Sequence, residues 1–245
     1  TTRVEETGAT VHAFHASFVT AASSVTALGL QADCVLADLG FASNQMDEMG
    51  RGLSFKGGGP LDMRLNTDSG MKAQDILETH SEEELANLIY ELGEEPYSRR
   101  IARKIVLERE KEPILDTARL AQIVRSAYGA RARTSRMHPA TRTFMALRIA
   151  VNNELEALDH LLQDVELGCR TANDGGWLKQ GARVTVISFH SLEDRRVKHA
   201  FVGLEKNGLG TRITRKPICA SDEEIARNPR SRPAKLRALH LLQED

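Results

Sequence analysis

The sequence predicts an α/β domain of the doubly wound type, split by an all-helical insert. Two short apolar runs, within 33–38 and 183–188, end in polar residues and are typical of strands in such a sheet. Between them, residues 74–128 carry helical periodicity without an intervening strand, which indicates a helical subdomain and not βαβ units. Two strand-like segments close the chain. We therefore expect the second half of a doubly wound sheet, interrupted by helices.

The first elements lead to an acidic residue at the end of a strand. Residues 9–14 carry β-prone types and predict a strand, and residues 19–30 predict a short helix. Residues 34–37 predict a buried strand that ends at Asp38. Ligands of open α/β sheets sit beyond the carboxyl ends of the strands, so Asp38 is placed for chemistry. A turn-capping role fits Asp38 equally well at this point.

A glycine-rich segment follows, Gly-Gly-Gly-Pro at 57–60. Because it lacks the strand–GxGxxG–helix context of a phosphate-binding loop, we interpret it as a turn.

Three helices are predicted next. Ser81 and Glu84 form a capping box, and the helix that they begin stops at Gly93. A second helix runs from Pro96 towards Pro113. Asp116 or Thr117 caps the third helix.

The rest of the chain returns to the sheet. A basic loop over 130–137 leads to one long helix from His138 to Leu162, and a glycine-rich loop over 168–182 holds the single tryptophan, Trp177. After the strand at 183–188, Ser191 with Asp194 predicts a cap for a helix to about Leu204. His190, beside this cap, is interpreted as structural. The segments 211–218 and 234–242 predict antiparallel strands joined by a polar loop.

Composition excludes several classes of protein. The chain has 245 residues, of which 41% are hydrophobic and 27% charged, which suits a globular protein. No stretch approaches the roughly 20 apolar residues of a membrane span, and the first residues lack the apolar core of a signal peptide. Three distant cysteines suggest neither a disulfide framework nor a metal cluster. We expect a cytoplasmic protein without a bound metal.

The net charge of −1 conceals two basic stretches. Between Asp116 and Glu154 there is no acidic residue, and the arginines there are Arg119, Arg125, Arg131, Arg133, Arg136, Arg142 and Arg148. The second stretch contains Arg227, Arg230, Arg232, Lys235 and Arg237. Arginine forks suit phosphate, so one face of the protein is a candidate for contact with a polyanion. A solvated surface is the alternative.

Several blocks of the sequence resemble one family. The blocks are Asp38-Leu-Gly with Ser43, Gln45 and Asp47, Arg51-Gly-Leu-Ser-Phe, Gly59-Pro-Leu-Asp-Met-Arg, Arg100-Ile-Ala-Arg, His138-Pro-Ala-Thr-Arg-Thr-Phe, Leu147-Arg-Ile-Ala-Val-Asn-Asn-Glu-Leu, Ile187-Ser-Phe-His-Ser-Leu-Glu-Asp-Arg and Asn228-Pro-Arg-Ser-Arg. In this order, from about His15 to Leu239, they resemble the ribosomal RNA small subunit methyltransferase H family.

The resemblance implies a class I, Rossmann-like methyltransferase that uses S-adenosylmethionine to methylate N4 of a cytosine in small-subunit (16S-type) ribosomal RNA. It implies a discontinuous methyltransferase domain over 1–69 and 140–245 and a helical insert over 70–139. Cofactor contacts are expected from Phe18, Asp38 and Gln45.

The chemistry of N4 methylation adds roles for particular residues. The exocyclic amine of cytosine is a poor nucleophile, so its alignment and an acceptor for its hydrogens are needed. Asp38 is the candidate catalytic residue, with cofactor binding alone as the alternative. The target base must leave its stack, and Arg136, Arg142 and Arg148 are candidates to bind the flanking phosphates.

The sequence departs from the family pattern at its beginning. The family places a strand with a cofactor-binding glycine-rich loop, and then an acidic residue for the ribose, before residue 9, and neither is found here. Gly58, Asn66 and Ala42 differ from the usual Asp, Asp and Ser. We therefore expect an N-terminally truncated sheet that lacks the donor side of its site. A non-catalytic RNA-binding remnant is the alternative function, and a homodimer is left open.

Overall fold

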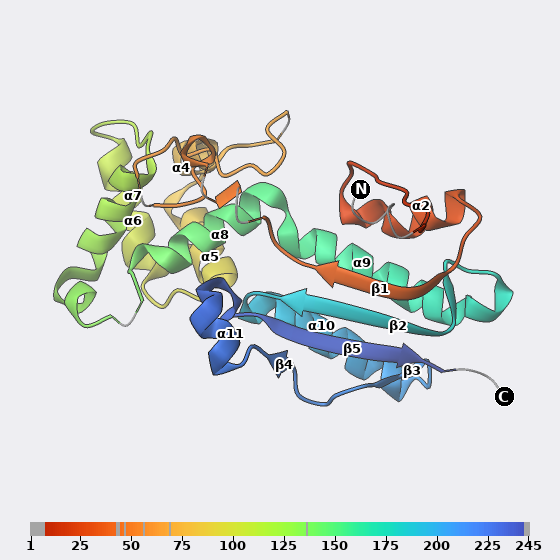
Figure 1. Ribbon diagram of the computed structural model, residues 1–245. Coiled ribbons are helices and arrows are strands. Elements are labelled where there is room, and N and C mark those ends of the chain that lie inside the picture. The colour runs from red at the N-terminus through yellow and green to blue at the C-terminus, as the bar shows by residue number, and fades with distance from the viewer. Residues whose placement is uncertain are drawn as a thin grey trace. The chain divides into compact units, whose positions relative to one another are not determined.

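A computed structural model describes residues 8–42, 45–46, 48–55, 57–68, 70–135 and 137–242 (Figure 1). The chain divides into two compact units. The sheet unit comprises Thr1–Leu39 and Glu156–Asp245, and the helical unit comprises Gly40–Leu155. The predicted insert over 70–139 lies within the helical unit, whose bounds are wider.

The sheet unit contains a mixed sheet in the strand order β1-β2-β5-β3, with β4 also paired to β5. Its strands are β1 (Ala32–Asp38), β2 (Leu178–Ser188), β3 (Gly210–Arg212), β4 (Ile218–Cys219) and β5 (Lys235–Leu241). β1 is parallel to β2, whereas β5 is antiparallel to β2, β3 and β4. The predicted α/β class and the antiparallel pairing at the end of the chain are confirmed, but the single strand predicted over 211–218 is wrong, since only its two ends form strands, β3 and β4. The insertion and the missing first strands stay predictions.

One face of this sheet packs on helices. The helices of the unit are α2 (Ala21–Ala27), α9 (Glu154–Arg170) from Glu156 on, α10 (Ser191–Lys206) and the short α11 (Asp222–Arg227). Figure 1 shows α9 and α10 on one side of the strands. The shared core includes Val35, Ala37, Val184, Val186, Leu239, Leu241, Leu158, Val165, Val197 and Phe201. Side chains alternate along a strand, so these residues form one face.

The opposite face is open at β1. The register pairs Leu36 with Thr185 and Asp38 with Ile187, and the side chain of Leu36 is 67% exposed. The position of the predicted strand is confirmed, but its expected burial is wrong. Val35 and Ala37 pack on the helix side while Leu36 is exposed on the other, so the apolar residues of β1 are not enclosed on both faces as is usual in parallel sheets.

The strand predicted at residues 9–14 is also wrong. These residues form no strand, and Phe14 is 58% exposed. A β-prone sequence forms a strand only where a neighbouring strand completes its hydrogen bonds, and this segment pairs with no strand that the structure describes.

The helical unit is built on a core of leucine and isoleucine. Among the described residues, its α-helices include α4 (Ala73–Thr79), α5 (Glu82–Gly93), α6 (Ser98–Arg109), α7 (Thr117–Tyr128) and α8 (Ala140–Asn152). Leu85, Ile89, Ile101, Ile105 and Leu120 are fully buried in this core. The predicted Ser81–Glu84 capping box and the Asp116 cap are both present.

Several elements differ from the sequence predictions. The glycine-rich loop predicted over 168–182 contains the end of α9 and the start of β2, which begins at Leu178 and not at 183. The long helix expected from His138 to Leu162 is two helices, because Asn153 adopts a left-handed conformation with φ 48° between α8 and α9. The cap of α10 is His190 with Glu193, not Ser191 with Asp194. The polar loop before β5 contains α11. None of the described helices combines the length and apolarity needed to cross a bilayer.

Candidate functional site

Asp38 lies at the carboxyl end of β1, on the open face of the sheet. It is paired in register with Ile187 of β2, and the next residue, Leu39, donates its backbone N–H to the carbonyl of Ile187 at 3.0 Å. Asp38 is exposed, and its side chain forms no hydrogen bond or ion pair with any residue that the structure describes. The carboxylate therefore does not cap a turn in the described part of the chain, and it can accept hydrogen bonds from a ligand. This favours the functional interpretation of Asp38 over the capping one.

The neighbouring end of β2 is fixed by a reciprocal helix cap. Glu193 is 3% exposed, and its Oε2 accepts hydrogen bonds from the backbone N–H groups of Phe189 at 2.8 Å and His190 at 3.3 Å. In return, Nδ1 of His190 accepts from the backbone N–H of Glu193 at 3.4 Å, and its Nε2 lies 3.3 Å from Oε1 of Glu193. This arrangement gives His190 the structural role expected from the sequence.

The residue that the sequence suggested for the cap has a different partner. Asp194 receives hydrogen bonds from Arg237 of β5, at 2.7 and 3.3 Å, and from Lys235 at 3.3 Å. Burial alone would raise the pKa of Asp194, but its hydrogen bond with Arg237 and the charges of Arg237 and Lys235 hold that pKa below its usual value. These contacts tie β5 to α10 behind the carboxyl edge of β2.

The second basic stretch is consequently not one free surface. Arg237 is only 6% exposed and is engaged with Asp194, together with Lys235, while Arg227 forms an exposed ion pair with Glu223. A phosphate-binding role for this stretch has no support from the positions of these three side chains.

The two remaining predicted cofactor residues lie in different units. Phe18 begins the 3₁₀ segment η1 (Phe18–Thr20) of the sheet unit, and its ring is 39% exposed. Gln45 belongs to the helical unit, where its side-chain Oε1 accepts a hydrogen bond from the backbone N–H of Ala42 at 3.0 Å. The roles of Phe18 and Gln45 towards a cofactor stay predictions.

The predicted RNA-binding arginines already have partners inside the helical unit, where they are described. Arg142 donates to the carbonyl of Glu94 at 3.0 Å. Arg148 binds both carboxylate oxygens of Glu154, at 2.7 and 2.8 Å, and its guanidinium lies 5.0 Å from the ring centroid of Phe41. Arg136 lies outside the described residues. Their contact with RNA stays a prediction, and for Arg148 it would compete with a half-buried ion pair.

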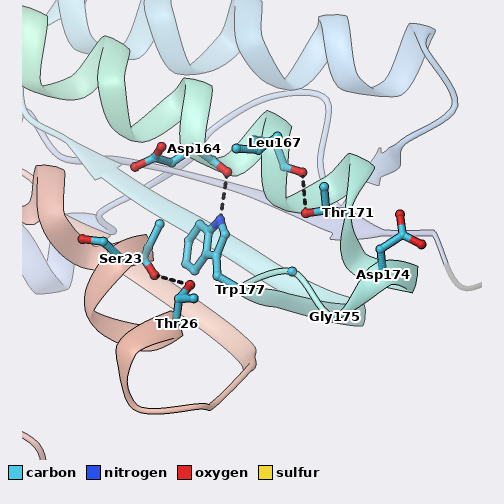
Figure 2. A pocket seen from close by; sticks show the side chains of 10 residues that line it. Ser23, Thr26, Asp164, Leu167, Thr171, Asp174, Gly175 and Trp177 are labelled. Atoms are coloured by element: carbon cyan, nitrogen blue, oxygen red, sulfur yellow. Dashed lines mark hydrogen bonds between the residues drawn. The ribbon is translucent and has the colours of Figure 1, made fainter.

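A separate pocket of about 330 Å³ lies at the other end of the sheet unit (Figure 2). Ser23 and Thr26 of α2, Leu167 of α9 and Trp177 are among its lining residues. Trp177 donates from Nε1 to the carbonyl of Asp164 at 2.9 Å.

This pocket is remote from Asp38. Ala32, the first residue of β1, donates to the carbonyl of Trp177 at 2.8 Å, which places the pocket at the amino end of the strand. Sequence reasoning assigned Trp177 only to a loop. The pairing of the loop with the start of β1 is a long-range contact that carries no local sequence signal.

Comparisons with known proteins identify relatives of the chain. The model of the MraW methylase family matches residues 1–242. The chain is 52% identical over 204 residues to the ribosomal RNA small subunit methyltransferase H of Prochlorococcus marinus, which covers 83% of this chain and 63% of that protein. It is 52% identical over 208 residues to the protein of the same name from a Synechococcus species, covering 84% and 64%. The chain thus spans just under two thirds of the length of these curated relatives.

Proposed function

Because the chain belongs to the MraW methylase family, we propose that it transfers a methyl group from S-adenosylmethionine to the N4 amine of a cytosine in small-subunit ribosomal RNA. The family resemblance seen in the sequence motifs is confirmed. The names of relatives with 52% identity support the methyl transfer and the ribosomal RNA substrate. The choice of N4 of cytosine comes from the motif resemblance, and a cytoplasmic site of action from the composition and the three distant cysteines.

The observation that carries the proposal is the free carboxylate of Asp38 at the carboxyl end of β1. A strand end in an open α/β sheet is where ligands bind, and Asp38 is exposed there without a partner among the described residues. A carboxylate at this position can accept a hydrogen bond from the exocyclic amine, orient it, and stabilise the positive charge that develops on nitrogen during transfer.

The residues of the sheet unit fit part of the cofactor. S-adenosylmethionine supplies an electrophilic methyl group on its sulfonium. The exposed ring of Phe18 is suited to pack against an adenine, and the carboxylate of Asp38 is suited to accept from an ammonium or hydroxyl group. Because one carboxylate can serve the cofactor or the target amine, separate measurements of binding and of transfer are needed to assign it.

A methyl-transfer assay with one matched control tests the proposal. The purified protein is incubated with S-adenosylmethionine labelled on its methyl group and with small-subunit ribosomal RNA, and the product nucleosides are identified by mass spectrometry. Asp38→Asn removes the carboxylate charge at the carboxyl end of β1. Asp33→Asn does the same near the start of that strand, where Asp33 is 73% exposed and pairs with Lys179 at 2.9 Å.

The expected product is N4-methylcytidine, with transfer reduced about 100-fold or more by Asp38→Asn and unchanged by Asp33→Asn. Calorimetry with S-adenosylmethionine separates the two roles of Asp38: a lost affinity assigns it to the cofactor, and a retained affinity assigns it to the amine. Methylation of a different nucleoside would overturn the target. Binding of ribosomal RNA with neither cofactor binding nor transfer would favour the non-catalytic RNA-binding alternative.

A further inference from the structure

Helices α6 and α7 of the helical unit lie antiparallel. At one end of the pair, Glu108 near the end of α6 accepts a hydrogen bond from Arg119 near the start of α7 at 2.7 Å. At the other end, the rings of Tyr97 and Tyr128 meet edge to face with centroids 4.9 Å apart. Tyr97 caps the start of α6 and Tyr128 is the last residue of α7.

Three cations at the Glu108 end share one carboxylate. Lys104 and Lys111 each lie 3.1 Å from the carboxylate of Glu108, and Arg119 lies 2.7 Å from it. Hydrogen bonds from Lys104 and Lys111 lower the pKa of Glu108 to about 2, so the carboxylate stays charged at neutral pH. These three cations are therefore already paired with a carboxylate of the protein, although the side chain of Lys111 is 65% exposed.

The tyrosine end carries arginines without such partners. Arg99 and Arg100, in the first turn of α6, and Arg133, at the end of the 3₁₀ segment η3 (Gly129–Arg133), are exposed. None of these three side chains forms a hydrogen bond or ion pair with a residue that the structure describes. We call Arg99, Arg100, Arg131 and Arg133 the arginine cluster. The cluster combines arginines from α6 and η3. The contacts of Tyr97 with Tyr128 and with Arg131 hold these two segments together.

Arg131 occupies a specific position in the cluster. Its guanidinium lies 5.5 Å from the ring centroid of Tyr97, and it donates from Nη1 to the hydroxyl of Tyr97 at 3.1 Å. Arg131 is nevertheless exposed. The cation–π contact and the hydrogen bond order the guanidinium, and because it is exposed it can still stack on another planar group.

The carboxylate in contact with both tyrosines does not offset this charge at the surface. Glu95 is fully buried, and its oxygens accept from the backbone N–H of Tyr97 at 2.9 Å and from the hydroxyl of Tyr128 at 2.6 Å. Burial, followed in size by the hydrogen bond with Glu95, raises the pKa of Tyr128 far above its ordinary value. Glu95 therefore fixes the two rings from inside and leaves the arginine cluster as the outward face.

We propose that the arginine cluster is a binding surface for single-stranded RNA, with Arg99, Arg100 and Arg133 on the phosphates and a base stacked on the exposed guanidinium of Arg131. Repeated exposed guanidinium groups suit a chain of phosphates, and unstacked bases pack on guanidinium planes. This proposal deepens the proposed function and rests on it, because the ligand class is the nucleic acid expected there. It assigns RNA contact to residues other than Arg142 and Arg148, which are engaged within the fold.

Filter binding of a single-stranded fragment of small-subunit ribosomal RNA, measured over a range of salt concentrations, tests the proposal. The variants are Arg99→Gln with Arg100→Gln, Arg133→Gln, Arg131→Gln and Arg131→Lys. The control, Arg170→Gln, removes one exposed arginine that pairs with Glu166 at the end of α9. Circular dichroism and thermal unfolding establish that each variant is folded.

Each lost phosphate contact is expected to reduce the slope of log affinity against log salt by about 0.7, the value for single strands. Arg131→Lys keeps the charge and is expected to keep the slope while weakening binding about tenfold, because the stacked base is lost. A duplex of the same sequence should not distinguish Arg131→Lys from the wild type. A merely structural role for Arg131 would instead affect unfolding and leave the affinity of folded protein unchanged.

If the cluster variants bind RNA with the same affinity and salt slope as Arg170→Gln, the proposed surface is wrong. The same conclusion holds if the cluster variants bind RNA normally and have instead lost the binding of an acidic protein partner. The methyl-transfer assay separates this failure from that of the proposed function. Normal methylation by the cluster variants at limiting RNA would leave the function intact and refute the surface. RNA binding that depends on the cluster in a protein without methyl transfer would support the surface and refute the function.

Discussion

Arg237 of β5 binds Asp194 of α10 with its Nε and Nη2 atoms, at 2.7 Å and 3.3 Å, and both side chains are almost enclosed. The pair joins the antiparallel strand β5 to the helix packed on it, and Lys235 adds a third hydrogen bond to Asp194 at 3.3 Å. It is the link between the last strand of the sheet and the helix that follows β2.

Removing one partner of this pair should destabilise the fold strongly. In Asp194→Ala the guanidinium of Arg237, which is 6% exposed, keeps its charge without a carboxylate, and the expected loss is about 3–5 kcal/mol in the free energy of unfolding. Urea denaturation measures it. The control Asp159→Ala breaks the more exposed pair of Asp159 with Arg196 and should cost under about 1 kcal/mol. Similar losses for both variants would show that the Asp194 pair contributes no more than a surface ion pair.

The same pair predicts a particular dependence of stability on pH. The pKa of Asp194 is lower in the folded protein than its usual value of 3.8. A lowered pKa means that the folded state binds the proton more weakly, so the contribution is fully present above about pH 4 and is lost as the pH falls through the folded pKa. The difference in stability between wild type and Asp194→Asn should therefore be constant from pH 5 to 7 and shrink below about pH 4. A difference that grew on acidification would refute this linkage.

Gly52 is expected to tolerate no side chain. Its φ is +63°, and a Cβ atom there would lie 1.8 Å from the carbonyl oxygen of Pro60. Gly52→Ala therefore combines an unfavourable backbone with a direct clash and should cost at least about 2 kcal/mol. Gly50→Ala is the matched control, because a Cβ at Gly50 meets no atom within 4 Å. Thermal unfolding of the two variants makes the comparison, and equal midpoints would contradict the prediction.

Local sequence signals predicted those elements whose determinants lie within a few residues. The Ser81–Glu84 capping box and the strand that ends at Asp38 are present as expected. The break between α8 and α9 was missed, because the left-handed Asn153 interrupts the helix for a single residue and the apolar spacing continues beyond it.

The cap of α10 shows a limit of the same reasoning. His190 with Glu193 and Ser191 with Asp194 have the same spacing, and serine is the more usual capping residue. The outcome depends on Arg237, more than 40 residues later, which engages Asp194 and leaves Glu193 for the cap. Such a contact has no local signature.

The candidate site was predictable in part for a related reason. Asp38 could be placed at a strand end from the sequence, and the structure adds that it has no partner among the described residues. The sequence alone could not show which arginines between Asp116 and Glu154 are engaged within the protein and which are exposed. Only the fold shows that Arg119, Arg142 and Arg148 bind within the protein while Arg131 and Arg133 face outward.

The three cysteines are expected to differ in reactivity. Cys34 and Cys219 are exposed, whereas burial, and to a lesser extent the charge of Glu166, raises the pKa of Cys169 to about 11. At pH 8 roughly one Cys169 thiol in a thousand is then a thiolate, and the thiolate is the reactive form.

Labelling with iodoacetamide, read out by peptide mass spectrometry, tests this difference. The reagent should modify Cys34 and Cys219 first, with Cys169 protected until urea unfolds the sheet unit. Because Cys169 packs against the core that contains Leu158 and Val184, its protection reports on that core. Equal labelling rates of the three thiols in the folded protein would mean that α9 does not shield Cys169 in solution.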